Sequence, residues 1–491
     1  MLVHSIGWGQ IYAPGETSVQ RYIGLDKWTP YNPAWLYQDS ATDIVRYAVE
    51  TGQTEDTFKR PFDPGKSNNM FFSTAGAKRL PGRQLFRGSF TYQKQVLDDI
   101  SWIQNSRPYI GIPFLIADTS TSGSSLNGLH WHIDYADIIL KEKLSWGLTL
   151  FYNVSQQYKT VFPRPKVDRR DIHLAAGLGA VLGSYCRTGL KVGYFDYQEQ
   201  IITSRYSMDQ WKTPVFYKIR GLDTPVIFEG KTSEERLNNL SGYTIDIDFT
   251  LRYPSGLSAD FNGGIEDASA TVVDGGNYPV DQGKWWSDRY YFSTSLSIPV
   301  KSSAVLFFLS GELAPQSARH PDLNIEVYQS RWKFLRGGVS AALQPLPQWE
   351  LTAGVTGGSE SYKRVDLYNG ILDYHHGSFV GISIGSKHRL SEKLTGSLLF
   401  AGEQYLPGQS IVYTERTGFF YDAITKVESD YYGAQKVFYT LDTNLDWQLT
   451  PDTRLIVNGK GYLLAPGHDA DQVSGTGTGW YFGLAVERAY R

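Results

Sequence analysis

Long stretches of this sequence alternate apolar and polar residues with a period of two, and no other feature constrains the fold as strongly. The clearest stretch is residues 242–253. One face carries Tyr243, Ile245, Ile247, Phe249, Leu251 and Tyr253, and the other carries Gly242, Thr244, Asp246, Asp248, Thr250 and Arg252. Successive side chains of a β-strand point to opposite faces, so the pattern predicts strands that separate an apolar from a wet environment. Residues 144–154, 437–449 and 480–487 repeat it.

Short and long connections between these strands follow one another in strict alternation. The eight short ones, which are rich in turn-forming residues, are 81–82, 141–142, 183–184, 254–255, 301–302, 346–347, 391–392 and 451–452. The nine long ones are 56–67, 97–124, 159–169, 205–238, 273–285, 317–325, 366–372, 409–433 and 467–474. Nine long and eight short connections join 18 strands. We therefore predict an all-β fold, a transmembrane antiparallel β-barrel of 18 strands with short periplasmic turns and long extracellular loops.

Two observations keep alternatives to this barrel open. The first two strands, residues 43–55 and 67–80, carry the weakest pattern, and without them the barrel would have 16 strands. The mean hydropathy of −0.32 is typical of a soluble secreted β-protein, which is the alternative fold class. A barrel has the same low average, because only alternate residues face lipid. The sequence has no apolar run of about 18 residues, as a transmembrane helix would require.

Composition excludes several function classes. The net charge of −3 gives no basic surface for nucleic acid. Cys186 is the only cysteine, so neither an intramolecular disulfide nor a cysteine-based metal site can form. The 33 Tyr and 13 Trp suit a membrane–water interface.

The chain divides into three parts in this interpretation. Residues 1–9 are read as the remnant of a signal peptide cut before Gln10, with an ordinary disordered terminus as the alternative. Residues 10–42 form an N-terminal segment that lies in the lumen or along the periplasmic rim. Residues 43–491 form the barrel.

The sequence resembles uncharacterised outer-membrane β-barrel families of Bacteroidota-type bacteria in its GWGQ motif, in residues 127–135 and in its loop-and-turn pattern. This resemblance implies a place in the bacterial outer membrane. It also implies an accessory role beside a TonB-dependent receptor in nutrient or metal uptake, and it supplies no catalytic residues. Barrels of this kind commonly end on an aromatic residue, whereas here Tyr490 is penultimate.

One histidine-rich strand is the candidate metal site. His130, His132 and Asp134 are spaced two apart, so they share the face predicted to point into the lumen. Residues two apart on a strand are separated by about 6.6–7 Å, so a shared ion would need a ligand from a neighbouring strand. A plain hydrated wall is the alternative. His375 and His376 point to opposite faces and are interpreted as an interfacial pair.

Charged residues on the polar faces predict a wet interior of mixed sign. The residues predicted to line the lumen are Asp246, Asp248, Arg252, Asp260, Glu266, Lys436, Asp442, Asp446, Arg454 and Lys460. The sharper hypothesis is a cation-selective path along the four acidic residues between 246 and 266.

Three functions follow from these features. The first is passage of a small solute through the barrel. The second is an accessory barrel of a TonB-dependent uptake or secretion complex, which would bind a receptor or surface lipoprotein through its aromatic-rich loops, such as residues 413–432. The third, a hydrolase using luminal His and Asp, is disfavoured because no nucleophile lies in register. Known enzyme motifs are absent from the sequence, so we expect no enzyme and no cofactor, with outer-membrane lipid and a solute as partners.

Overall fold

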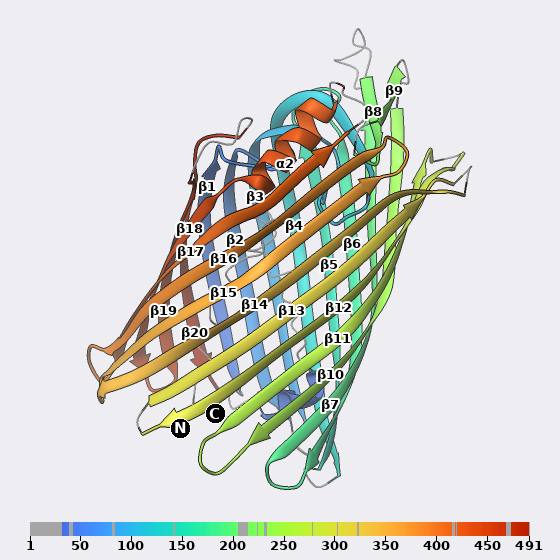
Figure 1. The fold of residues 1–491 in the computed structure, drawn as a ribbon. Helices are drawn as coiled ribbons and strands as arrows, with labels where there is room; N and C mark the ends of the chain where they lie inside the picture. Colours follow the sequence, from blue (N-terminus) through green and yellow to red (C-terminus); the bar gives the residue numbers. More distant parts are fainter. Residues whose placement is uncertain are drawn as a thin grey trace.

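The first and last strands of the molecule pair with each other and so close its sheet. Strand β1 (Ile44–Asp56) pairs antiparallel with β20 (Gly477–Ala489) along its whole length and with β2 (Lys66–Arg79) on its other side. This closure turns the sheet into a cylinder of steeply tilted strands (Figure 1). Every strand in it has two hydrogen-bonded neighbours, which a sheet in an apolar surrounding requires.

The remaining wall strands follow in chain order. They are β3 (Leu85–Ile103), β4 (Phe114–Leu140), β5 (Leu144–Lys159), β6 (Lys166–Leu182), β7 (Cys186–Ser204), β10 (Ser233–Arg252), β11 (Ser258–Asp274), β12 (Val280–Val300), β13 (Ser303–Arg319), β14 (Glu326–Leu346), β15 (Trp349–Asp366), β16 (Ile371–Arg389), β17 (Leu394–Tyr413), β18 (Lys436–Thr450) and β19 (Thr453–Pro466). Two further strands, β8 and β9, extend the sheet outside the ring, so the wall has 18 strands. The prediction of 18 strands is confirmed, and the 16-strand alternative is wrong because β1 and β2 belong to the wall.

This computed structural model describes most of the chain. The described residues are 32–38, 43–80, 84–140, 143–204, 215–222, 224–229, 233–276, 278–301, 303–321, 324–414, 418, 420–467 and 473–490. The predicted signal-peptide remnant, residues 1–9, lies outside them. No helix among the described residues is long and apolar enough to cross a membrane.

The side chains of the wall alternate between its outer and inner faces, as the sequence pattern predicted. On β10, Ile245 and Ile247 are 52% and 53% exposed on the outside, whereas Asp246 between them is 1% exposed. Tyr243 and Tyr253 mark the two ends of the outward apolar set, and Tyr243 packs against Tyr194 of β7 with ring centroids 5.4 Å apart. The outer surface is therefore an apolar band with aromatic residues near its limits, as lipid contact requires.

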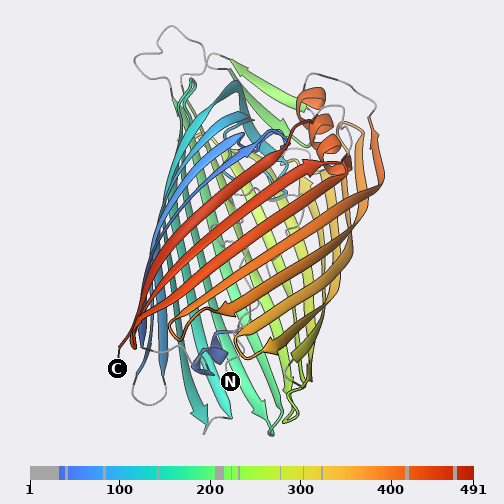
Figure 2. The ribbon, with the colours of Figure 1, turned by 90° about the vertical axis from the view of Figure 1, so that its left-hand side faces the viewer.

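The two ends of the cylinder differ in their connections. All eight predicted short connections join neighbouring strands at one end, which we call the turn end. The other end, the loop end, carries more ordered structure than the sequence predicted. The connection predicted at 97–124 shortens to 104–113, because β3 and β4 continue beyond their predicted limits. The connection at 409–433 contains a π-helical turn, η3 (Tyr421–Thr425), and a helix, α2 (Lys426–Gly433), which lie over the loop end (Figure 2).

A hairpin inserted after β7 also belongs to the loop end. It consists of β8 (Val215–Arg220) and β9 (Thr224–Glu229), within the connection predicted at 205–238. Residues 217–220 of β8 pair with residues 114–117 of β4. Lys218 of β8 is buried between Glu234 of β10 and Asp274 of β11, with both ion pairs at 2.5 Å. The hairpin is thus fixed to the rim by backbone pairing and by buried charge.

The alternation can be tested at one level of the wall. Ile247 faces outward, and Ser293 of β12 lines the interior close by in register, since Ser293 pairs with Asn262, Asn262 pairs with Asp248, and Asp248 is the chain neighbour of Ile247. We expect Ile247→Arg to destabilise the barrel in bilayers by about 2–4 kcal/mol, because the guanidinium would enter the apolar band. Ser293→Arg is the matched control and should fold like the parent. Refolding into lipid vesicles, followed by heat-dependent gel mobility, measures both, and equal refolding of the two variants would contradict the assignment of faces.

Candidate functional site

A large cavity occupies the interior of the barrel. Its volume is about 1050 Å³, and its lining reaches from Asn32 and Trp35 toward the turn end to Tyr109 and Trp332 toward the loop end. Five of the ten residues predicted to line the lumen lie on this cavity: Asp248, Asp260, Glu266, Asp442 and Lys460. Arg289 and Glu312 also line the cavity and form an ion pair at 2.7 Å, which the alternating pattern did not predict. The interior therefore carries charges of both signs beside apolar side chains.

The other five predicted luminal residues lie elsewhere on the inner side or near the ends of the wall. Asp246 is buried and pairs with Lys191 at 3.1 Å. Lys436 is buried at the loop end, where its Nζ donates to the carbonyl oxygen of Tyr431. Asp446 and Arg454 form a pair at 3.8 Å, and Arg252 is exposed.

The three residues of the candidate metal site do not converge on one point: His132 and Asp134 contact each other, and His130 has other partners. His132 Nε2 lies 3.0 Å from Asp134 Oδ1, and Arg87 binds the other oxygen of Asp134 at 2.6 Å. His130 instead contacts Gln93, at 2.8 Å, and Asn153. Across the described residues, no group of three or more His, Cys, Asp or Glu side chains is arranged to hold a metal ion.

The N-terminal residues that the structure describes lie against the inner wall near the turn end. They form a short 3₁₀ helix, η1 (Pro33–Gln38), which contacts β4, β5 and β6. Asn32 donates to Asp248 Oδ2 at 3.0 Å, and the Trp35 indole donates to Asp248 Oδ1 at 2.5 Å. Both hydrogen bonds end on a carboxylate that the sequence predicted to face open water.

Four wall glycines make room for this helix. Added Cβ atoms would collide with Asn32, Pro33 or Trp35 at the wall positions Gly147, Gly177, Gly179 and Gly189. At Gly147 the distance to the backbone carbon of Pro33 would be 2.5 Å. Side chains at these positions would push η1 off the wall, so the glycines form a bed shaped to this segment.

The loop end is closed over by a structure that we call the cap: residues 57–65, residues 104–113, β8 and the η3–α2 segment. Apolar side chains from all four parts pack into shared clusters. One cluster contains Phe62, Leu97, Ile100, Ile103, Ala117, Ile219, Phe420 and Ile424. A second contains Phe58, Tyr431, Tyr432, Ala434 and Val473. Burial of these side chains gives the cap a core of its own, so it is a folded element rather than a set of separate loops.

Buried charges fasten the cap to the wall. Arg364 of β15 binds Asp373 of β16 at 2.5 Å and Glu428 of α2 at 2.7 Å, and all three are nearly inaccessible. His375 joins them, with Nε2 2.6 Å from Asp373 Oδ1. The interpretation of His375 as an interfacial residue is therefore wrong, because the cap covers it. Thr425 of η3 adds a hydrogen bond to the carbonyl oxygen of Leu222.

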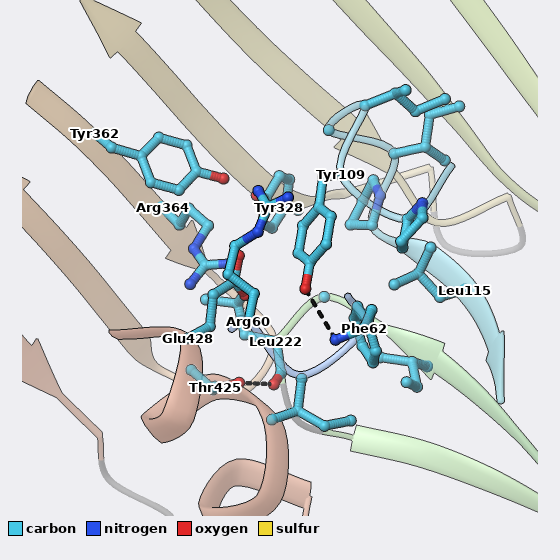
Figure 3. A pocket seen from close by; sticks show the side chains of 18 of the residues that line it. Arg60, Phe62, Tyr109, Leu115, Leu222, Tyr328, Tyr362, Arg364, Thr425 and Glu428 are labelled. Carbon is cyan, nitrogen blue, oxygen red and sulfur yellow. Dashed lines mark hydrogen bonds and ion pairs between the residues drawn. The ribbon is translucent and has the colours of Figure 1, made fainter. Parts of the chain in front are cut away.

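A second cavity, the cap pocket, lies inside this structure and has a volume of about 230 Å³. Figure 3 shows its side chains converging from the barrel wall, the loops and the η3–α2 segment. Arg60 is buried over the Tyr109 ring, 3.6 Å from its centroid, and pairs with Asp63 at 2.9 Å. The Tyr109 hydroxyl accepts a hydrogen bond from the Phe62 N–H at 3.0 Å. Four residues, Tyr109, Ile110, Gln316 and Trp332, line both this pocket and the main cavity, so the two adjoin.

The phenols of the cap pocket are protonated. Burial raises the pKa of Tyr109 well above its ordinary value, and the charge of Asp63 raises it further. Burial likewise raises the pKa of Tyr432 in α2. Both hydroxyls therefore remain neutral over the ordinary pH range and keep a proton to donate.

Sequence reasoning missed most of this pocket. The aromatic-rich stretch 413–432 includes two of its residues, Phe420 and Tyr432, but the sequence carried no signal for Arg60, Arg364 or Glu428. The Arg364–Glu428 pair joins residues 64 positions apart through a fold of the loop, which no periodic pattern reports.

Comparison with known proteins places the chain in a family. A family of unknown function, DUF6850, has a model that matches residues 33–487. The chain belongs to this family. The match runs from η1 almost to the end of β20, so it includes both η1, which packs on the four wall glycines, and the cap. No curated protein matches the sequence. The predicted resemblance to an uncharacterised family is confirmed, while its assignment to Bacteroidota-type bacteria stays a prediction.

Three similar solved structures are a receptor, a transporter and a channel by their titles, all at low identity. The siderophore receptor PiuA from Acinetobacter baumannii has a TM-score of 0.42 and 8% identity, over 89% of this chain and 81% of that chain. The ferric citrate transporter FecA has a TM-score of 0.44 and 8% identity, over 91% and 79%. A variant of the monoaromatic hydrocarbon channel TodX has a TM-score of 0.33 and 11% identity, over 94% and 93%. We draw no functional argument from scores this low.

The bed beneath η1 gives a direct test. Gly147→Val would place a branched side chain where Pro33 lies, so we expect η1 to leave the wall and residues 32–38 to be cut much faster by proteases. Gly461→Val in β19 is the control, since the nearest atom to an added Cβ there is 3.8 Å away. Limited proteolysis with mass spectrometry measures the cleavage. Equal cleavage in both variants would contradict a fitted bed.

Proposed function

We propose that this protein is an outer-membrane β-barrel that carries a small solute between the cell exterior and the periplasm, with the cap as its outer gate. A closed wall with an apolar outer band supports location in the outer membrane. Under this proposal the loop end faces outward and the turn end faces the periplasm, as in barrels with short periplasmic turns.

The observation that carries the proposal is the main cavity of about 1050 Å³ between the cap and η1. A wall of 18 strands is too wide for its own side chains to fill, so its interior holds water, loops or both. Here the loops fill only the outer end and η1 covers part of the inner end. A purely structural barrel would have no reason to keep a chamber of this size between two closures.

The cap has the properties of a gate. Besides apolar packing, a few polar contacts hold the η3–α2 segment, among them Glu428 with Arg364 of the wall and Thr425 with Leu222 next to β8. Its pocket adjoins the chamber through shared lining residues. A solute that enters the pocket therefore stands at the entrance to the chamber, and release of the η3–α2 segment would open the way.

A cation-selective path is less well supported. Asp246 is neutralised by Lys191, and Asp248 receives hydrogen bonds from Asn32 and Trp35. Neither carboxylate stands free along a channel, so we do not include cation selectivity in the proposal. We also assign no catalysis to the protein.

The accessory-barrel function is the second candidate. It is supported by aromatic side chains at the loop end that lie open on the surface: Tyr278 is 87% exposed, Tyr368 57% and Tyr413 56%. Rigid aromatic side chains are common anchors of protein interfaces. Co-purification of a TonB-dependent receptor or a surface lipoprotein, lost on substituting these tyrosines with serine, would favour this function.

Conductance of the purified protein in planar bilayers tests the proposal. The double variant Thr425→Val with Glu428→Gln removes two fastenings of the cap that are worth about 1–3 kcal/mol together. We expect about tenfold more channel opening than in the parent protein, because the closed state loses that stabilisation.

Asp422→Asn is the matched control, since Asp422 lies on the same segment with an exposed side chain. It should behave like the parent. If the double variant and the parent are equally silent while both remain folded, passage through this barrel is refuted and the accessory function is favoured.

A further inference from the structure

One carboxylate in the cap pocket has an oxygen without a partner. Glu360 of β15 is 6% exposed and lines the pocket. Its Oε1 accepts a hydrogen bond from the Trp332 indole at 3.2 Å, whereas its Oε2 is buried without any hydrogen bond. An unsatisfied buried oxygen of this kind is unfavourable, and a ligand that donates a hydrogen bond to it would offset that cost.

The other charges on the pocket are already matched. Arg60 is paired with Asp63, and Arg364 is held between Asp373 and Glu428. Lys436 lies close by, and its positive charge acts on Glu360. Its Nζ lies 4.0 Å from the Tyr431 ring centroid and donates a hydrogen bond to the Tyr431 carbonyl oxygen. An anionic ligand would meet the carboxylates of Glu360 and Glu428 with both lining arginines engaged elsewhere. A cationic ligand would reach the unpartnered Oε2 of Glu360 after a small displacement of the pocket side chains, because that oxygen is buried in this structure.

Aromatic side chains line the same pocket as Glu360. Trp332 is hydrogen-bonded to Glu360 itself, and Tyr328, Tyr362 and Tyr432 line the same pocket. Indole and phenol faces attract cations, with Trp the strongest of them, and they also stack on flat apolar groups. A volume of about 230 Å³ lies just below the usual range of ligand pockets, so it suits a small molecule rather than a peptide.

We propose that the cap pocket binds a small organic cation, an amine carried on a flat ring, with the ammonium group at Glu360 Oε2 beside Trp332 and the ring between the pocket tyrosines. The inference rests on the proposed function, because it names the class of solute that the barrel would pass. Trp332 lines the main cavity as well, so the bound amine would lie at the border between cap and chamber.

Calorimetric titration of the full-length protein in detergent tests this inference with three probes of one shape: phenethylamine, 2-phenylethanol and phenylacetate. We expect phenethylamine to bind at least about tenfold more tightly than the other two, since only its ammonium group can form a charge-assisted hydrogen bond with Glu360. Glu360→Gln should remove that advantage. Glu350→Gln, on the same strand near the turn end, is the control and should retain it.

Tyr109→Leu serves as a second variant in case Glu360→Gln does not fold, because Tyr109 lies in a loop outside the wall. It should weaken phenethylamine binding through loss of the ring. Equal affinity for the three probes, tighter binding of phenylacetate, or no binding of any probe would each overturn the inference. Conductance of the same samples separates this result from the proposed function: channel opening without amine selectivity removes only the inference, and amine binding without opening removes only the passage.

Discussion

Backbone amides and carbonyls in an apolar surrounding have no solvent to bond with, and this constraint governs the whole structure. The pairing of β1 with β20 satisfies it, because it leaves no strand of the wall with an open edge. In a closed wall, one face of every strand meets the apolar surrounding and the other face meets the interior. Apolar and polar residues therefore alternate along each strand with a period of two. The width of an 18-strand wall follows from closure, and the interior chamber follows from the width.

The two ends of the chamber are covered by different structures, the loop end by the cap and part of the turn end by η1. At the loop end, apolar clusters and buried ion pairs hold the cap, and Arg364 is the residue that links α2 to the wall. At the turn end, η1 rests on glycines and is held through Asp248. Buried ion pairs are costly to break but add little over apolar packing, so they favour one defined closed arrangement over many. A barrel built to stay permanently open would need neither closure.

The wall could be predicted from the sequence, and the closures could not. Strand count, turn positions and the inward direction of Asp246 all follow from periodicity and turn residues, which are local signals. The partners of those residues are not local. Lys191 neutralises Asp246 from another strand, and Asn32 reaches Asp248 across 216 positions. The cap pocket depends on loops that fold back on one another, so its members share no spacing. His375 illustrates this, because its position beside a loop predicts an interfacial residue, whereas the cap buries it.

Spin-label scanning along β10 tests the closed, two-faced wall most directly. Cys186→Ser leaves a chain without cysteine, so single cysteines at positions 243 to 250 can each carry a nitroxide. In lipid vesicles the account predicts high accessibility to oxygen at the odd, outward positions and low accessibility to oxygen at the even, inward positions, with Ile247 and Asp246 as the sharpest contrast. Accessibility that does not alternate along the strand, or an even position that collides with oxygen as often as Ile247, would contradict it.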